Sequence, residues 1–226
     1  MSNASATVLV AGGTSGIGLA LARGFVDAGL GDLPGNEERL QFYDLDVTDD
    51  AVVMALVDTF ERLEVVINAA GIIRRTDELK SDVFASVVDV NVNGTMRSCA
   101  AARSLLARSK GCIINIASML SNFWWWPCFR LLASKGGVVQ LTKSLAIAYA
   151  PDGIRANALA PGWIATPMIQ ASRADEARNK AIVDRTSLSR WGNPKELVGP
   201  ALFLAGDAAS FVTGTVLNVD GGYAVM

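Results

Sequence analysis

Residues 8–19 read Val-Leu-Val-Ala-Gly-Gly-Thr-Ser-Gly-Ile-Gly-Leu, an apolar run followed by a glycine-rich turn and the start of an amphipathic segment. The glycines allow a tight turn, close approach of a pyrophosphate to the backbone, and close packing of a helix on a strand. The helix behind them offers N–H groups and the positive end of its dipole to an anion. A plain strand-to-helix turn is the alternative. We interpret the stretch as a phosphate-binding loop made of Gly12, Thr14, Ser15, Gly16, Ile17 and Gly18.

Beyond this loop, short runs rich in Val and Ile alternate with segments of helical periodicity. The runs show little polar alternation, which is typical of a parallel sheet buried on both faces. The order predicts a single-domain Rossmann fold over residues 1–226, an α/β doubly wound parallel sheet with helices on both faces. Residues 29–36 read as loop where the second strand belongs, so that region is expected to be truncated. The predicted strands are residues 7–10, 40–43, 65–68, 111–116, 154–159 and 216–219, and the main predicted helices are 19–27, 51–60, 83–106, 133–150 and 197–205.

The composition excludes several functional classes. Apolar residues make up 51% of the 226 residues and the net charge is −2, so the sequence predicts a small-molecule partner and no nucleic acid. There is no histidine, and the three cysteines are widely spaced, which excludes a Ser-His-Asp triad and argues against a metal site or a disulfide framework. No apolar run reaches about 18 residues and no signal-like leader is visible, so we expect a cytoplasmic protein without a membrane segment.

Further motifs follow the predicted strands in an order that resembles the short-chain dehydrogenase/reductase family over nearly the whole chain. The resemblance implies that Asp46 and Val47 lie against an adenine ring. It implies that the turn Asn68, Ala69, Ala70 and Gly71, with Ala69 in place of the usual second asparagine, passes near the adenine ribose. It implies that Pro161, Gly162, Ile164 and Thr166 hold the nicotinamide amide. From chemistry alone, Asp46 could instead cap the next helix, and Pro161-Gly162 could be a simple turn.

The resemblance also implies a catalytic set. In this family a tyrosine exchanges a proton with the substrate oxygen, a lysine four residues later lowers its pKa and binds the ribose, and a serine thirteen residues before the tyrosine bonds the substrate oxygen. An asparagine on a preceding helix organises a water. Lys135, Ser118 and Asn91 match three of these positions, whereas the tyrosine position holds Leu131, which cannot exchange a proton.

The residues around Leu131 are also unusual, because residues 124–132 read Trp-Trp-Trp-Pro-Cys-Phe-Arg-Leu-Leu where the family has a glycine-rich segment. One interpretation is a genuine aromatic lid or contact surface. Our other hypothesis is an out-of-frame reading of the coding DNA. Shifted by one base, compatible codons give Gly-Gly-Gly-Leu-Val-Ser-Gly-Tyr-Ser, which restores a glycine loop and a tyrosine at position 131.

Within the family, the resemblance points to sugar-acid dehydrogenases of the 2-deoxygluconate or 2-keto-3-deoxygluconate type. An anionic polyol favours a bidentate arginine, although most surface arginines are simply solvated; the candidates are Arg74, Arg75, Arg173 and Arg190. NAD or NADP is the expected cofactor, with a weak preference for NAD because Ser15 stands where many NADP users carry a basic residue. Two helices with small apolar faces predict a homodimer or homotetramer.

Three functions remain open from the sequence. The first is an NAD(P)-dependent oxidoreductase that transfers a hydride between nicotinamide and a secondary alcohol or ketone. The second is a non-catalytic dinucleotide-binding pseudoenzyme, because of Leu131. The third is a lyase or dehalogenase on the same fold, which is disfavoured because the dinucleotide motifs are intact.

Overall fold

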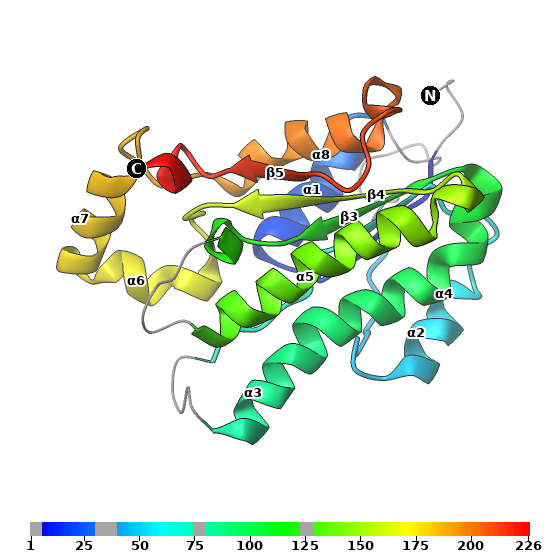
Figure 1. The fold of residues 1–226 in the computed structure, drawn as a ribbon, viewed down its shortest axis with the longest axis horizontal. Helices are drawn as coiled ribbons and strands as arrows, with labels where there is room; N and C mark the ends of the chain where they lie inside the picture. The colour runs from blue at the N-terminus through cyan, green and yellow to red at the C-terminus, as the bar shows by residue number, and fades with distance from the viewer. Residues whose placement is uncertain (1–5, 30–39, 75–79, 123–128) are drawn as a thin grey trace.

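The computed structural model describes residues 6–29, 40–74, 80–122 and 129–226. Its centre is a sheet of five strands in the order β1-β2-β3-β4-β5, and every neighbouring pair is parallel (Figure 1). Parallel pairing brings the carboxyl ends of all five strands to one edge, where such folds bind ligands. The strands are β1 (Val8–Ala11), β2 (Val65–Asn68), β3 (Cys112–Ile116), β4 (Arg155–Pro161) and β5 (Val216–Val219).

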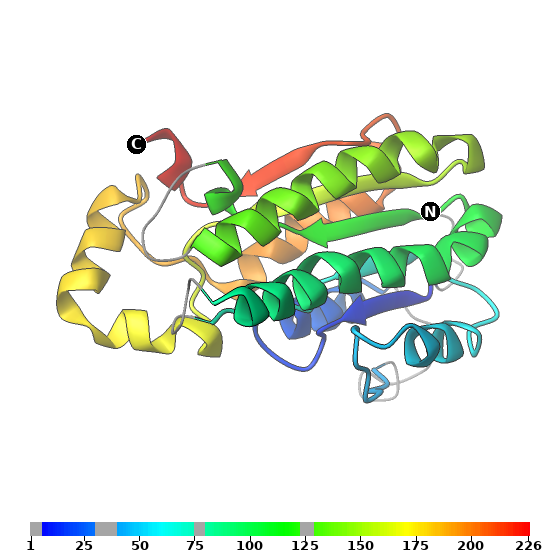
Figure 2. The ribbon, with the colours of Figure 1, turned by 60° about the horizontal axis from the view of Figure 1, so that its bottom comes forward.

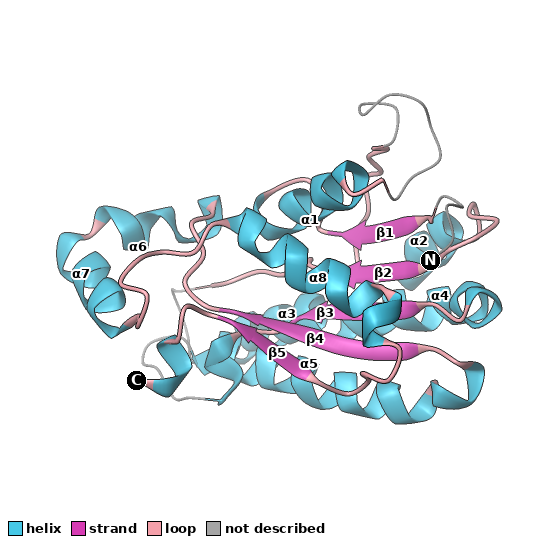
Figure 3. Ribbon diagram, turned by 90° about the horizontal axis from the view of Figure 1, so that it is seen from above, coloured by secondary structure: helices cyan, strands magenta, loops and turns pink. Residues whose placement is uncertain are grey.

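Helices cover both faces of the sheet, as Figure 3 shows. On one face, α1 (Gly16–Asp27) and α8 (Val198–Ala205) pack against Val65 and Ile67 of β2. On the other face, α4 (Gly94–Ser109) and α5 (Phe129–Ala148) enclose Val66 of the same strand. Successive side chains of a strand point to opposite faces, so the apolar run of β2 is buried on both sides. The prediction of a doubly wound Rossmann fold is confirmed.

The long helix predicted over residues 83–106 is interrupted by a π-helical turn. It is built as α3 (Ser81–Val88), the π turn η1 (Asp89–Asn93) and α4, which follow one another as a single helical segment (Figure 2). The first part of this segment lies beside the start of α5. A π turn inserts a residue into the helical ladder and is frequent at functional sites. Here it carries Asn91.

The strand predicted at residues 40–43 is wrong, because residues 40–46 have no regular secondary structure. Among the described strands, β1 is at one edge of the sheet, and residues 40–46 do not pair with its free side. A cavity of about 440 Å³ lies between β1 and residues 40–45 and is also lined by Phe25 and Leu56. Part of the loop predicted at 29–36 lies outside the described residues.

The remaining α-helices of the described residues are α2 (Asp50–Val57), α6 (Gln170–Ala174) and α7 (Glu176–Arg185). The last two lie beyond the carboxyl edge of the sheet, on the same side as the start of α5 (Figure 1). Among the described residues, no helix combines the length and apolar character that a bilayer span requires. No cluster of potential metal ligands occurs in the same residues.

Candidate active site

The glycine-rich loop joins the end of β1 to the start of α1. Gly12 has φ of 79°, and a Cβ there would lie 2.6 Å from the backbone nitrogen of Ala70. A Cβ on Gly18 would lie 2.1 Å from the carbonyl oxygen of Gly12. Any side chain at either position would therefore collide with backbone. Thr14 and Ser15 are exposed beside the first turn of α1, whose N–H groups lack partners within the helix. This arrangement suits an anion.

Asp46 and Val47 lie in the segment that leads into α2. The carboxylate of Asp46 accepts hydrogen bonds of 2.8 Å from both the backbone N–H and the hydroxyl of Thr48, and these bonds lower its pKa. Asp49, not Asp46, caps α2 by accepting from the backbone of Ala51 and Val52. The alternative that Asp46 caps the helix is therefore wrong. Asp46 remains exposed and Val47 is buried.

The turn after β2 begins with a buried asparagine and continues with half-buried small residues. Asn68 is 3% exposed, and its Nδ2 donates to Oδ1 of Asn115 at 2.9 Å, so its side chain belongs to the core between strands. The backbone N–H of Ala69 donates to the carbonyl of Ala11, which holds the turn against the glycine-rich loop. Ala69 and Ala70 are half-buried. Small residues are required here because Gly12 passes within contact distance of Ala70.

Asn91 is fully buried in the π turn and fixes three groups. Its Oδ1 accepts from the backbone N–H of Ile72 at 2.8 Å, and its Nδ2 donates to the carbonyl of Ile72 at 3.2 Å and to Oγ of Ser134 at 3.0 Å. A Cβ on Gly71 would lie 3.2 Å from Oδ1 of Asn91 and 3.7 Å from Nζ of Lys135. Gly71, Asn91 and Lys135 therefore meet at one point.

Lys135 projects from the first part of α5 into this point. Its Nζ donates to the carbonyl of Ile116 at 2.5 Å, and burial lowers its pKa from 10.5 to about 8. Ser118 follows the same strand and is half-buried, with its Oγ accepting from the backbone N–H of Leu120. The hydroxyl proton of Ser118 can still be donated to a ligand. The structure thus brings Asn91, Ser118 and Lys135, the three residues that match the predicted catalytic set, to the carboxyl edge of the sheet.

Leu131 lies one turn before Lys135 on α5. Its half-buried side chain packs against a cluster that includes Met119, Trp163 and Tyr223. Its carbonyl accepts from Oγ of Ser134 at 3.0 Å. An aliphatic side chain in this place makes apolar contacts and supplies no proton. Residues 123–128, which include the three tryptophans, lie outside the described residues.

The segment after β4 closes the opposite side of the site. Gly162 packs so closely on β5 that a Cβ would lie 2.6 Å from Cα of Asp220. Ile164 is 4% exposed and pairs with Gly192 in a single parallel bridge, which holds its backbone in place. The side chain of Thr166 lies 3.4 Å from where a Cβ of Gly16 would be, so this segment contacts the phosphate-binding loop. Pro161 ends the strand and is buried.

The four arginines proposed for substrate recognition differ in their surroundings. Arg190 is bound by both carboxylate oxygens of Glu196, at 2.8 and 2.7 Å, and this pairing lowers the pKa of Glu196 to about 2. Arg173 on α6 lies 5.7 Å from the ring centre of Trp191. Arg74 is exposed, and Arg75 lies outside the described residues. Arg190 is therefore already paired with Glu196, and this pairing says nothing against Arg173, Arg74 or Arg75.

Two features of the site were not predicted from the sequence. Ser134 accepts a hydrogen bond from Asn91. Its position directly before Lys135 was the feature of the sequence that could have identified it as part of the site. Trp163, Trp191 and Tyr223 form edge-to-face contacts with ring centres 5.8 and 6.2 Å apart, under the α6–α7 region. Their wide separation in the sequence gave no indication that they meet.

Comparisons with known proteins agree with this geometry. A profile of the enoyl-(acyl carrier protein) reductase family matches residues 34–224. Galactitol 2-dehydrogenase (L-tagatose-forming) of Cereibacter sphaeroides is 37% identical over 97% of this chain and 95% of its own length. The 2-dehydro-3-deoxy-D-gluconate 5-dehydrogenase of Escherichia coli is 40% identical over 76% of this chain and 70% of its own.

A solved structure extends the agreement to the fold. The gluconate 5-dehydrogenase of Burkholderia cenocepacia, in complex with NADP and tartrate, is 35% identical with a TM-score of 0.89, covering 97% of this chain and 95% of that one. The alignment with the galactitol enzyme runs over 242 residues, more than the 226 of this chain, so this chain has gaps against it. By its sequence matches and its fold, the chain belongs to the short-chain dehydrogenase/reductase family of NAD(P)-dependent oxidoreductases.

Proposed function

We propose that this chain interconverts a secondary hydroxyl and a ketone on a sugar acid or polyol, using NAD or NADP. The observation that carries the proposal is the meeting of Gly71, Asn91 and Lys135 at the carboxyl edge of the sheet. The relatives named as galactitol, gluconate and 2-dehydro-3-deoxy-D-gluconate dehydrogenases support this substrate class. The tartrate in the gluconate 5-dehydrogenase structure agrees with a site that accepts a small hydroxy acid.

Each group in the site has a proposed task. The glycine-rich loop holds the pyrophosphate, and Lys135 donates to ribose hydroxyls from its position beside Gly71. Ser118 donates to the substrate oxygen, and Asn91 keeps Ile72 and Ser134 in place around Lys135. The bound nicotinamide would supply or accept the hydride. Arg173, which lies 5.7 Å from the ring centre of Trp191, is our candidate for a substrate carboxylate.

Leu131 is the one position that conflicts with this chemistry, since proton exchange with the substrate oxygen needs an ionisable group. The relatives are named as dehydrogenases, and nothing in the comparisons supports a pseudoenzyme. We therefore favour the hypothesis that residues 124–132 represent a shifted reading frame and that the working enzyme carries tyrosine at position 131. A clean in-frame TGG-TGG-TGG run in the source DNA would rule this out.

The deciding experiment combines peptide mapping with an activity assay on one sample. Mass spectrometry of peptides across residues 111–135 establishes which residue stands at 131. NAD(P)H formation is then followed with gluconate as the charged substrate and with galactitol as the uncharged one. Tyrosine at 131 with turnover is the expected result. A confirmed leucine, with cofactor binding but no turnover of either substrate, would replace the proposal with a non-catalytic binding protein.

The cofactor preference and the assembly are separate proposals. We propose a modest preference for NAD, because Ser15 offers no positive charge to a 2′-phosphate. In that case Ser15→Arg should improve the KM for NADP while leaving that for NAD nearly unchanged. We also propose a cytoplasmic homodimer or homotetramer that pairs through α4 and α5, which light scattering of the purified protein would test.

A further inference from the structure

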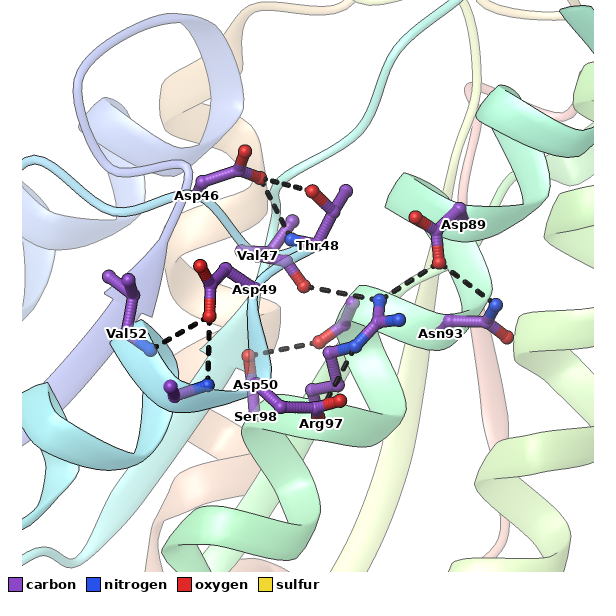
Figure 4. Close-up of polar contacts among 12 residues, drawn as sticks. Asp46, Val47, Thr48, Asp49, Asp50, Val52, Asp89, Asn93, Arg97 and Ser98 are labelled. Carbon is purple, nitrogen blue, oxygen red and sulfur yellow. Dashed lines mark hydrogen bonds and ion pairs between the residues drawn. The ribbon is translucent and has the colours of Figure 1, made fainter.

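Arg97 on α4 lies between the segment that leads into α2 and the π turn that carries Asn91, as Figure 4 shows. Its Nη1 donates to Oδ1 of Asp89 at 3.0 Å and to the carbonyl of Val47 at 3.4 Å. Its Nε lies 3.3 Å from Oδ1 of Asp50. One guanidinium therefore contacts the loop assigned to the adenine ring, the first turn of α2, and the π turn that carries Asn91.

Direct packing joins the same two segments. A Cβ on Gly94 would lie 2.7 Å from Cγ2 of Val47, so the end of the π turn rests against this buried valine with no room for a side chain. Close-packed interiors transmit small displacements because there is little free volume to absorb them. A shift of Val47 must therefore move either Gly94 or the guanidinium of Arg97.

The π turn itself is held at several points around Asn91. The carboxylate of Asp89 also accepts from Nδ2 of Asn93 at 3.0 Å, and the hydroxyl of Thr95 donates to the carbonyl of Asn91 at 2.8 Å. Asp89 and Asn91 lie in the same short turn, so a displacement of Asp89 also displaces Asn91. Asn91 in turn fixes Ile72 and Ser134 beside Lys135.

The burial of the charged groups decides which contacts of Arg97 hold the two segments in place. The side chain of Arg97 is 19% exposed and that of Asp89 is 37% exposed, whereas Asp50 is 78% exposed. Solvent screens the pair with Asp50, so it contributes little. The planar guanidinium has a fixed set of donors, and its contacts to Asp89 and Val47 therefore define one relative position of the two segments.

We propose that Arg97 is a positioning residue that couples binding of the adenine half of the cofactor to the geometry of the π turn around Asn91. This rests on the proposed function, because it requires Asp46 and Val47 to contact the adenine. Adenine binding restrains Val47, and the hydrogen bonds of Arg97 pass this restraint to Asp89. The π turn therefore becomes more rigid before any nicotinamide contact is made.

The test uses AMP, which carries the adenine half alone, and amide hydrogen exchange of the full chain. In the wild type, AMP should slow exchange both in residues 46–50 and in residues 89–95. In Arg97→Met, the slowing should remain at 46–50 but fall below about twofold at 89–95, from about fivefold or more in the wild type. Arg97→Lys should retain part of the effect.

Arg103→Met is the matched control. Arg103 lies on the same helix and also pairs with an aspartate, Asp152 at 2.7 Å, but contacts neither segment. It should behave as the wild type, and thermal unfolding should show all variants folded. Slowing at 46–50 with none at 89–95 in the wild type would overturn the coupling alone. Equal slowing at 89–95 in Arg97→Met and the wild type would do the same. No effect of AMP at 46–50 would instead overturn the proposed adenine site.

Discussion

Replacing Lys135 with methionine should stabilise the protein at neutral pH while weakening cofactor binding. Lys135 is buried, and burial lowers its pKa from 10.5 to about 8. At pH 7 the folded protein therefore carries a charge in a place that disfavours it, by about 3 kcal/mol at about 1.4 kcal/mol per unit. Methionine keeps most of the volume without the charge. It loses the bond to the carbonyl of Ile116, which offsets about 1 to 2 kcal/mol of the gain.

The pH dependence separates this explanation from a general packing effect. Between the folded pKa of about 8 and the ordinary value of 10.5, the unfolded chain binds the extra proton, so wild-type stability gains from rising pH. Below the folded value both states are protonated and the penalty is constant. The stability advantage of Lys135→Met should therefore shrink by about 3 kcal/mol from pH 7 to pH 11.

Urea unfolding of the wild type and the variant at several pH values measures this difference in unfolding free energy. The contributions of the other titrating groups are the same in both proteins and cancel. Lys143→Met is the control, since Lys143 is exposed on the same helix and its replacement separates the loss of a lysine from the loss of a buried charge. A Lys135→Met advantage that stays constant between pH 8 and 10.5 would show that Lys135 is not a buried, destabilising charge.

Three further substitutions test the site. In a chain that carries leucine at 131, Leu131→Tyr should raise turnover by about 100-fold or more, because it adds the missing proton donor. NADH formation measures this, and an equal gain from Leu131→Phe would disprove it. Gly94→Ala should lower the free energy of unfolding by about 1 to 3 kcal/mol and weaken cofactor binding, since its Cβ would lie 2.7 Å from Cγ2 of Val47. Thermal unfolding and a cofactor titration measure the two effects, and unchanged binding would argue against the adenine role of Val47. Ser118→Ala should lower kcat/KM by about 100-fold without changing the cofactor Kd, and a loss of cofactor affinity instead would move Ser118 to a structural role.

The sequence predicted those parts of the fold in which local pattern and tertiary position agree. The apolar run of β2 and the glycine-rich loop after β1 needed only periodicity and the sterics of glycine. Residues 40–43 show the limit, because whether a short apolar segment pairs with the free side of β1 depends on tertiary context and not on local pattern. No feature of the sequence near Asn91 distinguishes the π turn from an ordinary helix.

The candidate site could be predicted wherever spacing along the chain carried the information. Lys135 and Ser118 were found by their separation from position 131, and both lie at the carboxyl edge of the sheet. Spatial neighbours that are distant in sequence were missed, because only folding brings them together. The contact of Arg97 with Val47 spans 50 residues, and the bidentate pairing of Arg190 with Glu196 depends on side-chain geometry.

The position of β1 at the edge of the sheet has a consequence for handling the protein. Among the described residues, the outer side of β1 faces a cavity and no further strand, and its four residues are all apolar. Edge strands without charges or proline are templates for pairing with another chain. Concentrated samples should therefore form β-rich aggregates through β1. A thioflavin T assay at rising protein concentration measures this pairing, and a protein that stays monodisperse without a thioflavin T response would contradict it.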